Sequence, residues 1–226
     1  LVFYNFRADR ERQIVEAFLK EDFDIFENPV RPDFVSMFRY RNDFENPVLF
    51  DKQIVEDTLG EAIEDADLSQ LRVAESQKVP HVTYFFNGQR ELEFENEERE
   101  FIESDKIRAF DEKPKMHAKE ITDIVIDSIE GQEHDFILLN FANCDLVGHT
   151  GDLEAAVTAV EEVDRNIGRL AEAVKDSDYE MLVTADHGNC EDMGVESPNT
   201  SHTLNKVPLV ALDSDIEEAQ ELTDVR

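Results

Sequence analysis

Residues Asp135 to Gly151 read D-F-I-L-L-N-F-A-N-C-D-L-V-G-H-T-G, a short apolar run that passes directly into a polar turn. The apolar part, Phe136 to Leu139, has the length and composition of a buried strand. In the turn, Asp145 and His149 stand four residues apart, a spacing that can aim both side chains at one point. This stretch therefore predicts a metal site at the end of a strand.

Two further polar turns adjoin apolar runs. Met181 to Thr184 is followed by Asp186-His187-Gly188-Asn189, and a turn that contains His202 precedes the apolar Val207 to Leu212. Carboxylate oxygen and imidazole nitrogen together suit divalent ions such as Zn or Mn, and ligands of α/β sheets bind beyond the carboxyl ends of the strands. A single His in such a turn is more often an ordinary hydrogen-bonded residue, so the prediction of a metal centre rests on the whole group.

The composition limits the partners that the chain can bind. Its 226 residues are 41% hydrophobic, enough for a core, and 54 Asp and Glu stand against 22 Lys and Arg. A formal net charge of -32 repels nucleic acids and anionic membranes, so neither is an expected partner. Self-repulsion of this size destabilises a fold in dilute salt. We therefore expect a halophilic organism with a salt-rich cytoplasm, and an ordinary acidic protein is the alternative.

Cysteine content and hydropathy point to the cytoplasm. Two cysteines, Cys144 and Cys190, do not make a disulfide framework in a chain of this length, and each is expected to be a small buried filler rather than a metal ligand. No apolar stretch approaches the roughly 20 residues that span a bilayer, and no signal peptide is recognisable. The chain opens at Leu1 in a strand-like segment without an initiator Met, so we expect it to be incomplete.

Strand and helix patterns alternate along the chain. Leu1 to Phe6 is strand-like, a helical stretch runs from Arg7 to Lys20, and a domain junction is expected near residue 50, after turns rich in Phe, Pro and Asn. The later strands are predicted at 71–74, 81–86, 136–139, 181–184 and 207–212, the later helices at 58–71, 116–129 and 153–174, and an acidic loop at 91–105. This order predicts an α/β sheet with helices on both faces.

Two arginines are conspicuous in so acidic a chain, and one lysine lies beside a predicted strand. Arg7 and Arg10 lie three apart at the predicted strand-to-helix junction, where guanidinium groups and free backbone N–H groups favour anions. Pairing with surface carboxylates is an equally good interpretation of both arginines. Lys78 precedes the predicted strand 81–86, and its position alone favours a solvated side chain.

Four motifs in chain order resemble a known enzyme family. They are Tyr4 to Arg10 (YNFRADR), His81 to Gly88 (HVTYFFNG), Asn140 to Gly151 (NFANCDLVGHTG) and Thr184 to Asn189 (TADHGN). Together they are similar to the cofactor-independent, or 2,3-bisphosphoglycerate-independent, phosphoglycerate mutases of the alkaline phosphatase superfamily. The resemblance runs nearly from end to end, and the combination is far more specific than Asp-His-Gly alone.

The resemblance implies a site and a reaction. Asp145, His149 and His202 match the ligands of one manganese ion, and Asp186 and His187 match two ligands of a second. Lys78 matches a lysine that neutralises the transferring phosphoryl group. Arg7 and Arg10 match arginines that hold phosphoglycerate. The family interconverts 3-phosphoglycerate and 2-phosphoglycerate in glycolysis and gluconeogenesis. It does so through a phosphoserine enzyme and two Mn²⁺, without 2,3-bisphosphoglycerate.

The chain departs from the family pattern. The nucleophilic serine and its partner aspartate are not in the chain, Cys144 stands where the family usually has Pro, and Gln89 stands where it usually has Gly. The resemblance therefore implies a C-terminal portion: residues 1–50 would end a transferase domain, and residues 51–226 would form most of an alkaline-phosphatase-like domain. Such a portion is expected to be inactive alone and the complete protein to be monomeric.

Two alternatives remain open at the level of sequence. One is another metal-dependent phosphomutase or phosphohydrolase of the same superfamily, acting on a different phosphorylated substrate. The other is a non-catalytic metal-binding domain that retains the ligands for its structure.

Overall fold

The computed structural model describes residues 1–6, 11–26, 32–41, 43–51, 55–194, 199–212 and 220–221. The chain divides into two compact units, Leu1–Ile54 and Val55–Arg226. The division falls close to residue 50, where the sequence changes character. That these units correspond to transferase and phosphatase domains stays a prediction.

The first unit is small and built on aromatic packing. Strands β1 (Val2–Phe3) and β2 (Val35–Ser36) pair in parallel, and helix α1 (Glu11–Leu19) belongs to the same unit. Its core consists of Val15, Phe34, Tyr40 and Phe44, with Phe3, Phe18, Leu19 and Phe38 packed against them. The strand predicted over Leu1 to Phe6 is shorter than expected because β2 offers only two residues for pairing, and Tyr4 is 78% exposed.

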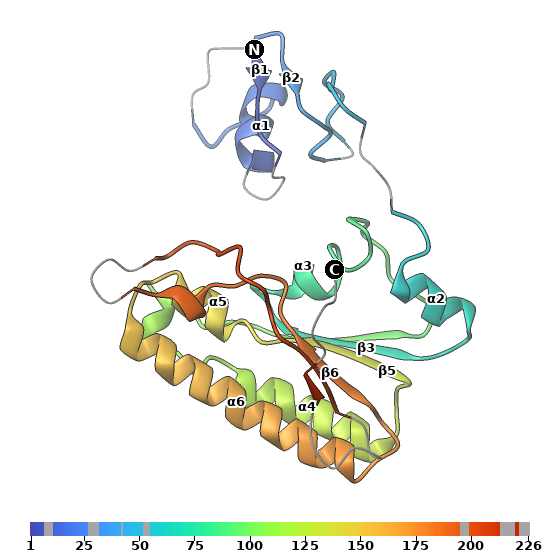
Figure 1. The fold of residues 1–226 in the computed structure, drawn as a ribbon. Helices are drawn as coiled ribbons and strands as arrows, with labels where there is room; N and C mark the ends of the chain where they lie inside the picture. Colours follow the sequence, from blue (N-terminus) through green and yellow to red (C-terminus); the bar gives the residue numbers. More distant parts are fainter. Residues whose placement is uncertain are drawn as a thin grey trace. The chain divides into compact units, whose positions relative to one another are not determined.

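A parallel sheet forms the centre of the second unit. Its strands are β3 (Gln70–Glu75), β4 (Glu97–Ile102) and β5 (Phe136–Asn140), in the order β4-β3-β5. Every residue of the central strand β3 is buried. Figure 1 shows the long helices α4 (Ala118–Gly131) and α6 (Leu153–Lys175) side by side on one face of this sheet, with the short helix α3 (Val79–Val82) on the other. The predicted α/β fold with flanking helices is confirmed.

The three C-terminal strands form a second sheet. These strands are β6 (Met181–Thr184), β7 (Leu209–Leu212) and β8 (Gln220–Glu221), and both of their pairings are antiparallel. Thr184, the last residue of β6, pairs with Leu209, the first residue of β7. The turn that follows β6 and the turn that precedes β7 must therefore emerge at the same place.

One hydrophobic core joins the two sheets of the second unit. Its buried members come from β3, α4, α6 and β7 and are Leu71, Val73, Ile121, Val125, Ile129, Leu170, Val174 and Leu212. Side chains of β5 and β6, including Ile137, Leu139 and Met181, pack against this cluster. Both sheets therefore rest on the same helices, which holds the polar turns at their ends in one region.

Three sequence-based element assignments are wrong. The helix predicted over 58–71 is shorter, since α2 (Leu59–Asp65) ends before Asp67, whose φ of 57° is left-handed, and Gln70 already begins β3.

The run 81–86, predicted as a strand, begins within the one-turn helix α3 (Val79–Val82), which has Pro80 near its start and is followed by turns. Pro suits the first turn of a helix because the amide that it lacks has no partner there. Thr83 Oγ1 donates a hydrogen bond to the carbonyl of Val79 at 2.8 Å, which closes this turn.

The third wrong assignment is the acidic loop 91–105, which contains β4. Its sequence, EEREFI, has little apolar alternation, yet all six residues pair in register with β3. Backbone hydrogen bonds to a buried neighbouring strand stabilise it without an apolar pattern. The sequence of β4 alone therefore does not predict a strand, because pairing with β3 stabilises it.

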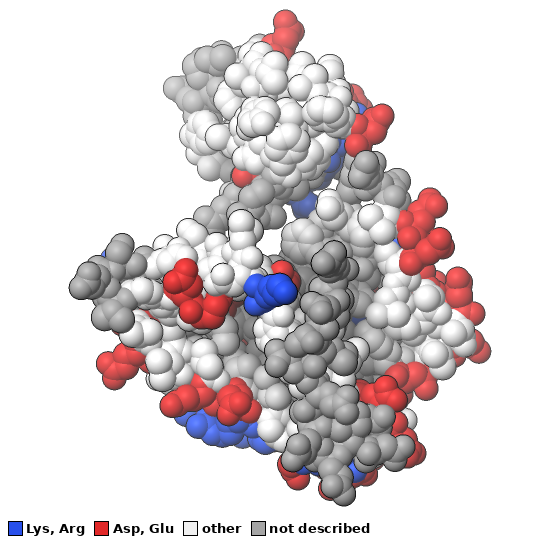
Figure 2. Space-filling model, in the orientation of Figure 1, with Lys and Arg blue, Asp and Glu red and all other residues white. Residues whose placement is uncertain are grey.

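Acidic side chains outnumber basic ones on the visible face of the molecule. On the face in view, Figure 2 shows Asp and Glu scattered widely and few Lys or Arg. Within the part of the chain that the structure describes, no helix combines the length and apolar character needed to cross a membrane.

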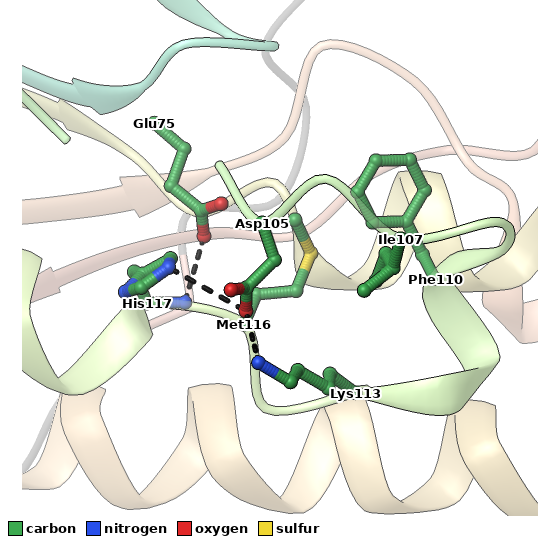
Figure 3. A pocket seen from close by; sticks show the side chains of 7 residues that line it. All are labelled: Glu75, Asp105, Ile107, Phe110, Lys113, Met116 and His117. Atoms are coloured by element: carbon green, nitrogen blue, oxygen red, sulfur yellow. Dashed lines mark hydrogen bonds and ion pairs between the residues drawn. The ribbon is translucent and has the colours of Figure 1, made fainter. Parts of the chain in front are cut away.

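The end of β3 is anchored by a buried carboxylate. Glu75 is fully buried, and it accepts hydrogen bonds from Ser104 Oγ and from the backbone N–H of His117, both at 2.8 Å. Figure 3 shows Glu75 beside Asp105, whose carboxylate lies 2.9 Å from Lys113 Nζ. These contacts join the end of β3 to the start of α4, three residues before Lys78.

Replacing Glu75 with Ala is expected to lower the free energy of unfolding. The hydroxyl of Ser104 and the amide of His117 would lose their buried acceptor, and each unsatisfied group costs about 1–3 kcal/mol. Urea denaturation followed by circular dichroism measures the change. Glu103→Ala is the matched control because Glu103 is an exposed neighbour, and equal stability of the two variants would contradict the anchoring role.

Candidate metal centre

The Asp145 turn is a short helix. Helix α5 (Asn143–Gly148) follows β5, with Asp145 in its first turn and His149 at its C-cap. The amide of His149 donates to the carbonyl of Asp145 at 3.1 Å, so the two residues occupy one helix face. Their side chains meet there, with His149 Nε2 3.0 Å from Asp145 Oδ1.

Antiparallel pairing brings the other two histidines together. Gly188 and Thr203 are bridged between the turns that flank β6 and β7, and each directly follows a histidine. The rings of His187 and His202 stack with centroids 3.6 Å apart and an interplanar angle of 18°. The sequence spacing between His187 and His202 gives no hint of this contact, which arises from the sheet.

The two groups converge on one carboxylate oxygen. His202 Nε2 lies 3.1 Å from Asp145 Oδ1 and 3.0 Å from His149 Nε2, and His187 Nε2 lies 3.9 Å from the same oxygen. Asp145, His187 and His202 each present one potential ligand atom, and these atoms lie within 4.8 Å of one another. The predicted ligands Asp145, His149, His187 and His202 are thus brought together from three separate turns.

The donor set fits a divalent cation. His149 Nδ1 lies 2.6 Å from the carbonyl oxygen of Thr200, so Nδ1 carries the proton of the neutral ring and Nε2 carries the lone pair. That lone pair faces Asp145 Oδ1, which is also an acceptor, at 3.0 Å. A divalent cation bound between these two acceptors would satisfy both, and one carboxylate with several imidazoles suits Mn or Zn.

Lys78 holds the other oxygen of Asp145. The residue is buried, at 4% exposure, and Nζ donates to Asp145 Oδ2 at 2.6 Å. The position of Lys78 in the sequence favours a solvated side chain, and this prediction is wrong. The turn that follows β3 places Lys78 in contact with Asp145. Burial of Asp145 opposes its ionisation, but the hydrogen bond and charge of Lys78, aided by His149, prevail and lower the pKa of Asp145 to about 2.

Asp186 lies at the margin of this group. Its side chain is half exposed, with Oδ2 3.6 Å from His187 Nε2 and 4.0 Å from His81 Nε2. His81 was not singled out by the sequence as a site residue, because the run 81–86 resembles a strand. Burial, together with the nearby charge of Lys78, lowers the pKa of His81 and favours its neutral ring.

Asn189 is a second residue that sequence reasoning missed. Its Nδ2 lies 3.2 Å from Asp145 Oδ1 and 3.3 Å from the Asp145 carbonyl oxygen. Gly148 makes room for it, since a Cβ there would lie 2.4 Å from Asn189 Oδ1. The position of Asn189, directly after Asp-His-Gly, is the only sequence signal of this contact.

The remaining predicted residues lie elsewhere. Cys190 Sγ donates to the carbonyl of Cys144 at 2.8 Å and packs beside Val147 and Met193. Both cysteines are partly buried, and their predicted role as packing residues stays a prediction. Arg7 and Arg10 lie outside the described residues, so their predicted role stays a prediction.

Comparison with known protein families gives a context for this geometry. Residues 35–225 match the model of the metalloenzyme superfamily. The chain belongs to the metalloenzyme superfamily. Residues 1–42 of this metalloenzyme chain additionally match the model of the N-terminus of 2,3-bisphosphoglycerate-independent phosphoglycerate mutases.

Individual metalloenzyme relatives carry the same name. The chain is 48% identical over 218 residues to the 2,3-bisphosphoglycerate-independent phosphoglycerate mutase of Moorella thermoacetica, covering 94% of this chain and 42% of the relative. It is 49% identical over 213 residues to mutase 1 of Methanosarcina acetivorans, covering 92% and 41%. The chain thus spans about two fifths of the length of these relatives.

A solved structure agrees with the fold. A crystal structure of Leishmania mexicana phosphoglycerate mutase at low cobalt concentration superimposes with a TM-score of 0.82 at 33% sequence identity. The match covers 96% of this chain and 43% of that structure. The resemblance to cofactor-independent phosphoglycerate mutases that the motifs indicate is confirmed for this portion of the protein.

Proposed function

We propose that this chain is part of a 2,3-bisphosphoglycerate-independent phosphoglycerate mutase, an isomerase that interconverts 3-phosphoglycerate and 2-phosphoglycerate in glycolysis and gluconeogenesis. The observation that carries the proposal is the convergence of three imidazoles on Asp145 Oδ1 while Lys78 holds Oδ2. Relatives that carry this name and match nearly the whole chain support the same substrate.

The proposed cofactors are two Mn²⁺ ions. Asp145, His149 and His202 would hold one ion, and Asp186 and His187 would contribute to the second, whose other ligands are not in this chain. Bound divalent metal neutralises phosphate charge and promotes ionisation of a nucleophilic hydroxyl. The mixed oxygen and nitrogen donors and their close spacing support this assignment.

The chain's own residues have distinct proposed roles. Lys78 presents a buried ammonium group beside Asp145 and would neutralise the equatorial oxygens of the transferring phosphoryl group. Asn189 holds Asp145 in its orientation through Nδ2. Arg7 and Arg10 would retain glycerate while its phosphate is on a serine supplied from outside this chain.

A second candidate follows from the breadth of the superfamily match. The model that matches residues 35–225 describes metalloenzymes in general, and this breadth favours, as the alternative, another phosphomutase or phosphohydrolase with the same metal centre. Such an enzyme would act on a different phosphorylated substrate and would not need Arg7 and Arg10. Comparing turnover of 3-phosphoglycerate with that of sugar phosphates separates the two.

The setting proposed for the enzyme is a salt-rich cytoplasm. A net charge of -32 supports this setting, because mobile cations screen the repulsion between surface carboxylates. The same charge disfavours nucleic acids and anionic membranes as partners. We propose a monomer, with phosphoglycerate as its partner.

Removing the metal is expected to abolish turnover and lower the melting temperature. A ligand that binds only the folded state at 100 times its Kd stabilises it by about 2.7 kcal/mol, and the chelated protein loses this contribution. The measurement is a coupled assay of 3-phosphoglycerate turnover, with differential scanning fluorimetry, on the full-length protein after EDTA treatment and after Mn²⁺ addition.

Two results would contradict the proposal. Turnover that persists in EDTA would remove the metal from the mechanism, and turnover of another phosphate ester in preference to 3-phosphoglycerate would favour the second candidate. Mg²⁺ addition is the control, because a centre rich in imidazole discriminates against an ion that prefers oxygen ligands.

A further inference from the structure

One carboxylate ties together the two turns that carry His187 and His202. Glu191 Oε2 accepts a hydrogen bond from the backbone N–H of Asn189 at 2.6 Å. Glu191 Oε1 accepts from the hydroxyl of Thr203 and from Asn205 Nδ2, the latter at 3.0 Å. A single side chain therefore bonds to both turns.

The bonded residues stand close to the proposed ligands. Asn189 comes two residues after His187, and Thr203 comes directly after His202. Between the two turns the backbone supplies the bond from the Thr203 N–H to the Gly188 carbonyl, at 2.9 Å. Among the described residues, the Glu191 side chain accepts two hydrogen bonds from the turn that follows His202, beside this one backbone bond. Glu191 therefore contributes most of the hydrogen bonding that sets the separation of the two turns.

Gly188 permits this arrangement. A Cβ at Gly188 would lie 2.1 Å from Glu191 Oε1 and 2.3 Å from Thr203 Oγ1, too close for any side chain. The glycine between His187 and Asn189 thus leaves the space through which the carboxylate reaches Thr203. Close approach, rather than an unusual backbone angle, explains a glycine at this position.

We propose that Glu191 is a positioning residue that sets the separation of His187 and His202 and thereby the affinity and geometry of the metal centre. The inference rests on the proposed function, because it presupposes that these histidines bind metal. Among the described residues Glu191 makes no hydrogen bond to a proposed ligand atom, so it acts through the backbone that carries the two rings. Partners of this kind typically change metal affinity by about 10- to 100-fold when removed.

The test is metal binding by the full-length protein with Glu191→Ala. We expect the Kd for Co²⁺ in calorimetric titration to rise about 10-fold or more, and the visible absorption bands of bound Co²⁺ to shift as the coordination changes. Glu191→Gln should fall between Glu191→Ala and the wild type, because one amide oxygen can still accept from Asn189 while the amide NH₂ donates to Thr203.

Asp192→Asn is the matched control. It removes the same charge one residue along the chain, from an exposed carboxylate that has no hydrogen bond or ion pair among the described residues. It should bind Co²⁺ as the wild type does. A loss of affinity in Asp192→Asn equal to that in Glu191→Ala would assign the effect to general electrostatics and overturn the positioning role.

Variants of Thr203 give a second test, which remains informative if Glu191→Ala folds poorly. Thr203→Val removes the hydroxyl at nearly constant volume and should weaken Co²⁺ binding, whereas Thr203→Ser keeps the hydroxyl and should restore it. Wild-type Co²⁺ affinity and spectra in both Glu191→Ala and Thr203→Val would overturn the inference. Absence of Co²⁺ binding by the wild type would instead overturn the proposed metal centre.

Discussion

Asp145→Asn should abolish mutase turnover in the full-length protein. Asp145 Oδ1 is the oxygen on which His149, His187 and His202 converge, and an amide cannot supply its negative charge. Bound metal contributes several kcal/mol of charge stabilisation in phosphoryl transfer, and each 1.36 kcal/mol corresponds to a factor of ten. We therefore expect kcat/KM for 3-phosphoglycerate to fall by about 1,000-fold or more, measured in a coupled assay with saturating Mn²⁺.

The control for this variant is Asp127→Asn, on the exposed surface of α4. It removes the same charge and should leave turnover unchanged. If Asp145→Asn lowers the melting temperature while turnover persists, the metal serves the structure alone, and the non-catalytic binding domain becomes the better interpretation.

Lys78→Met should reduce kcat by about 100- to 1,000-fold, the usual cost of removing one preorganised group that stabilises transition-state charge. Met keeps the length and apolar character of the side chain, so packing around a buried position is largely preserved. The proposed role predicts a fall in kcat rather than a rise in KM, and steady-state kinetics with 3-phosphoglycerate separates these two effects.

Lys78→Met should also change the ionisation of Asp145, the carboxylate at the centre of the site. Burial of Asp145 favours its neutral form, and Lys78 counteracts this through its hydrogen bond and charge. Without Lys78, the pKa of Asp145 should therefore rise from about 2. Nuclear magnetic resonance titration of the metal-free protein measures this change. Lys119→Met, on the surface of α4, is the matched control, and wild-type kcat in Lys78→Met would refute the assigned role.

Local patterns predict the elements that bury an apolar face. The helices α4 and α6 and the strands β5 and β6 appear close to their predicted ranges, because their apolar residues recur with helical or strand spacing. The pair Asp145 and His149 is also predicted from local spacing, since one helical turn brings positions four apart together.

Elements and contacts that depend on a distant neighbour escape this reasoning. Strand β4 has a charged sequence and is stabilised by pairing with β3, and α3 overlaps the start of the run 81–86, which resembles a strand. The burial of Lys78 depends on the path of the chain beyond β3. Contacts made by His81 and Asn189 at the site have no periodic signal at all.

Composition, hydrophobic period and motifs are properties of short segments, and they were enough to predict the α/β class, the acidic character and the candidate ligands. They could not predict that His187 and His202 stack, that Lys78 is buried against Asp145, or that Glu191 joins two turns. Those contacts link residues far apart in the chain, and antiparallel pairing of β6 with β7 and packing on a shared core bring them together.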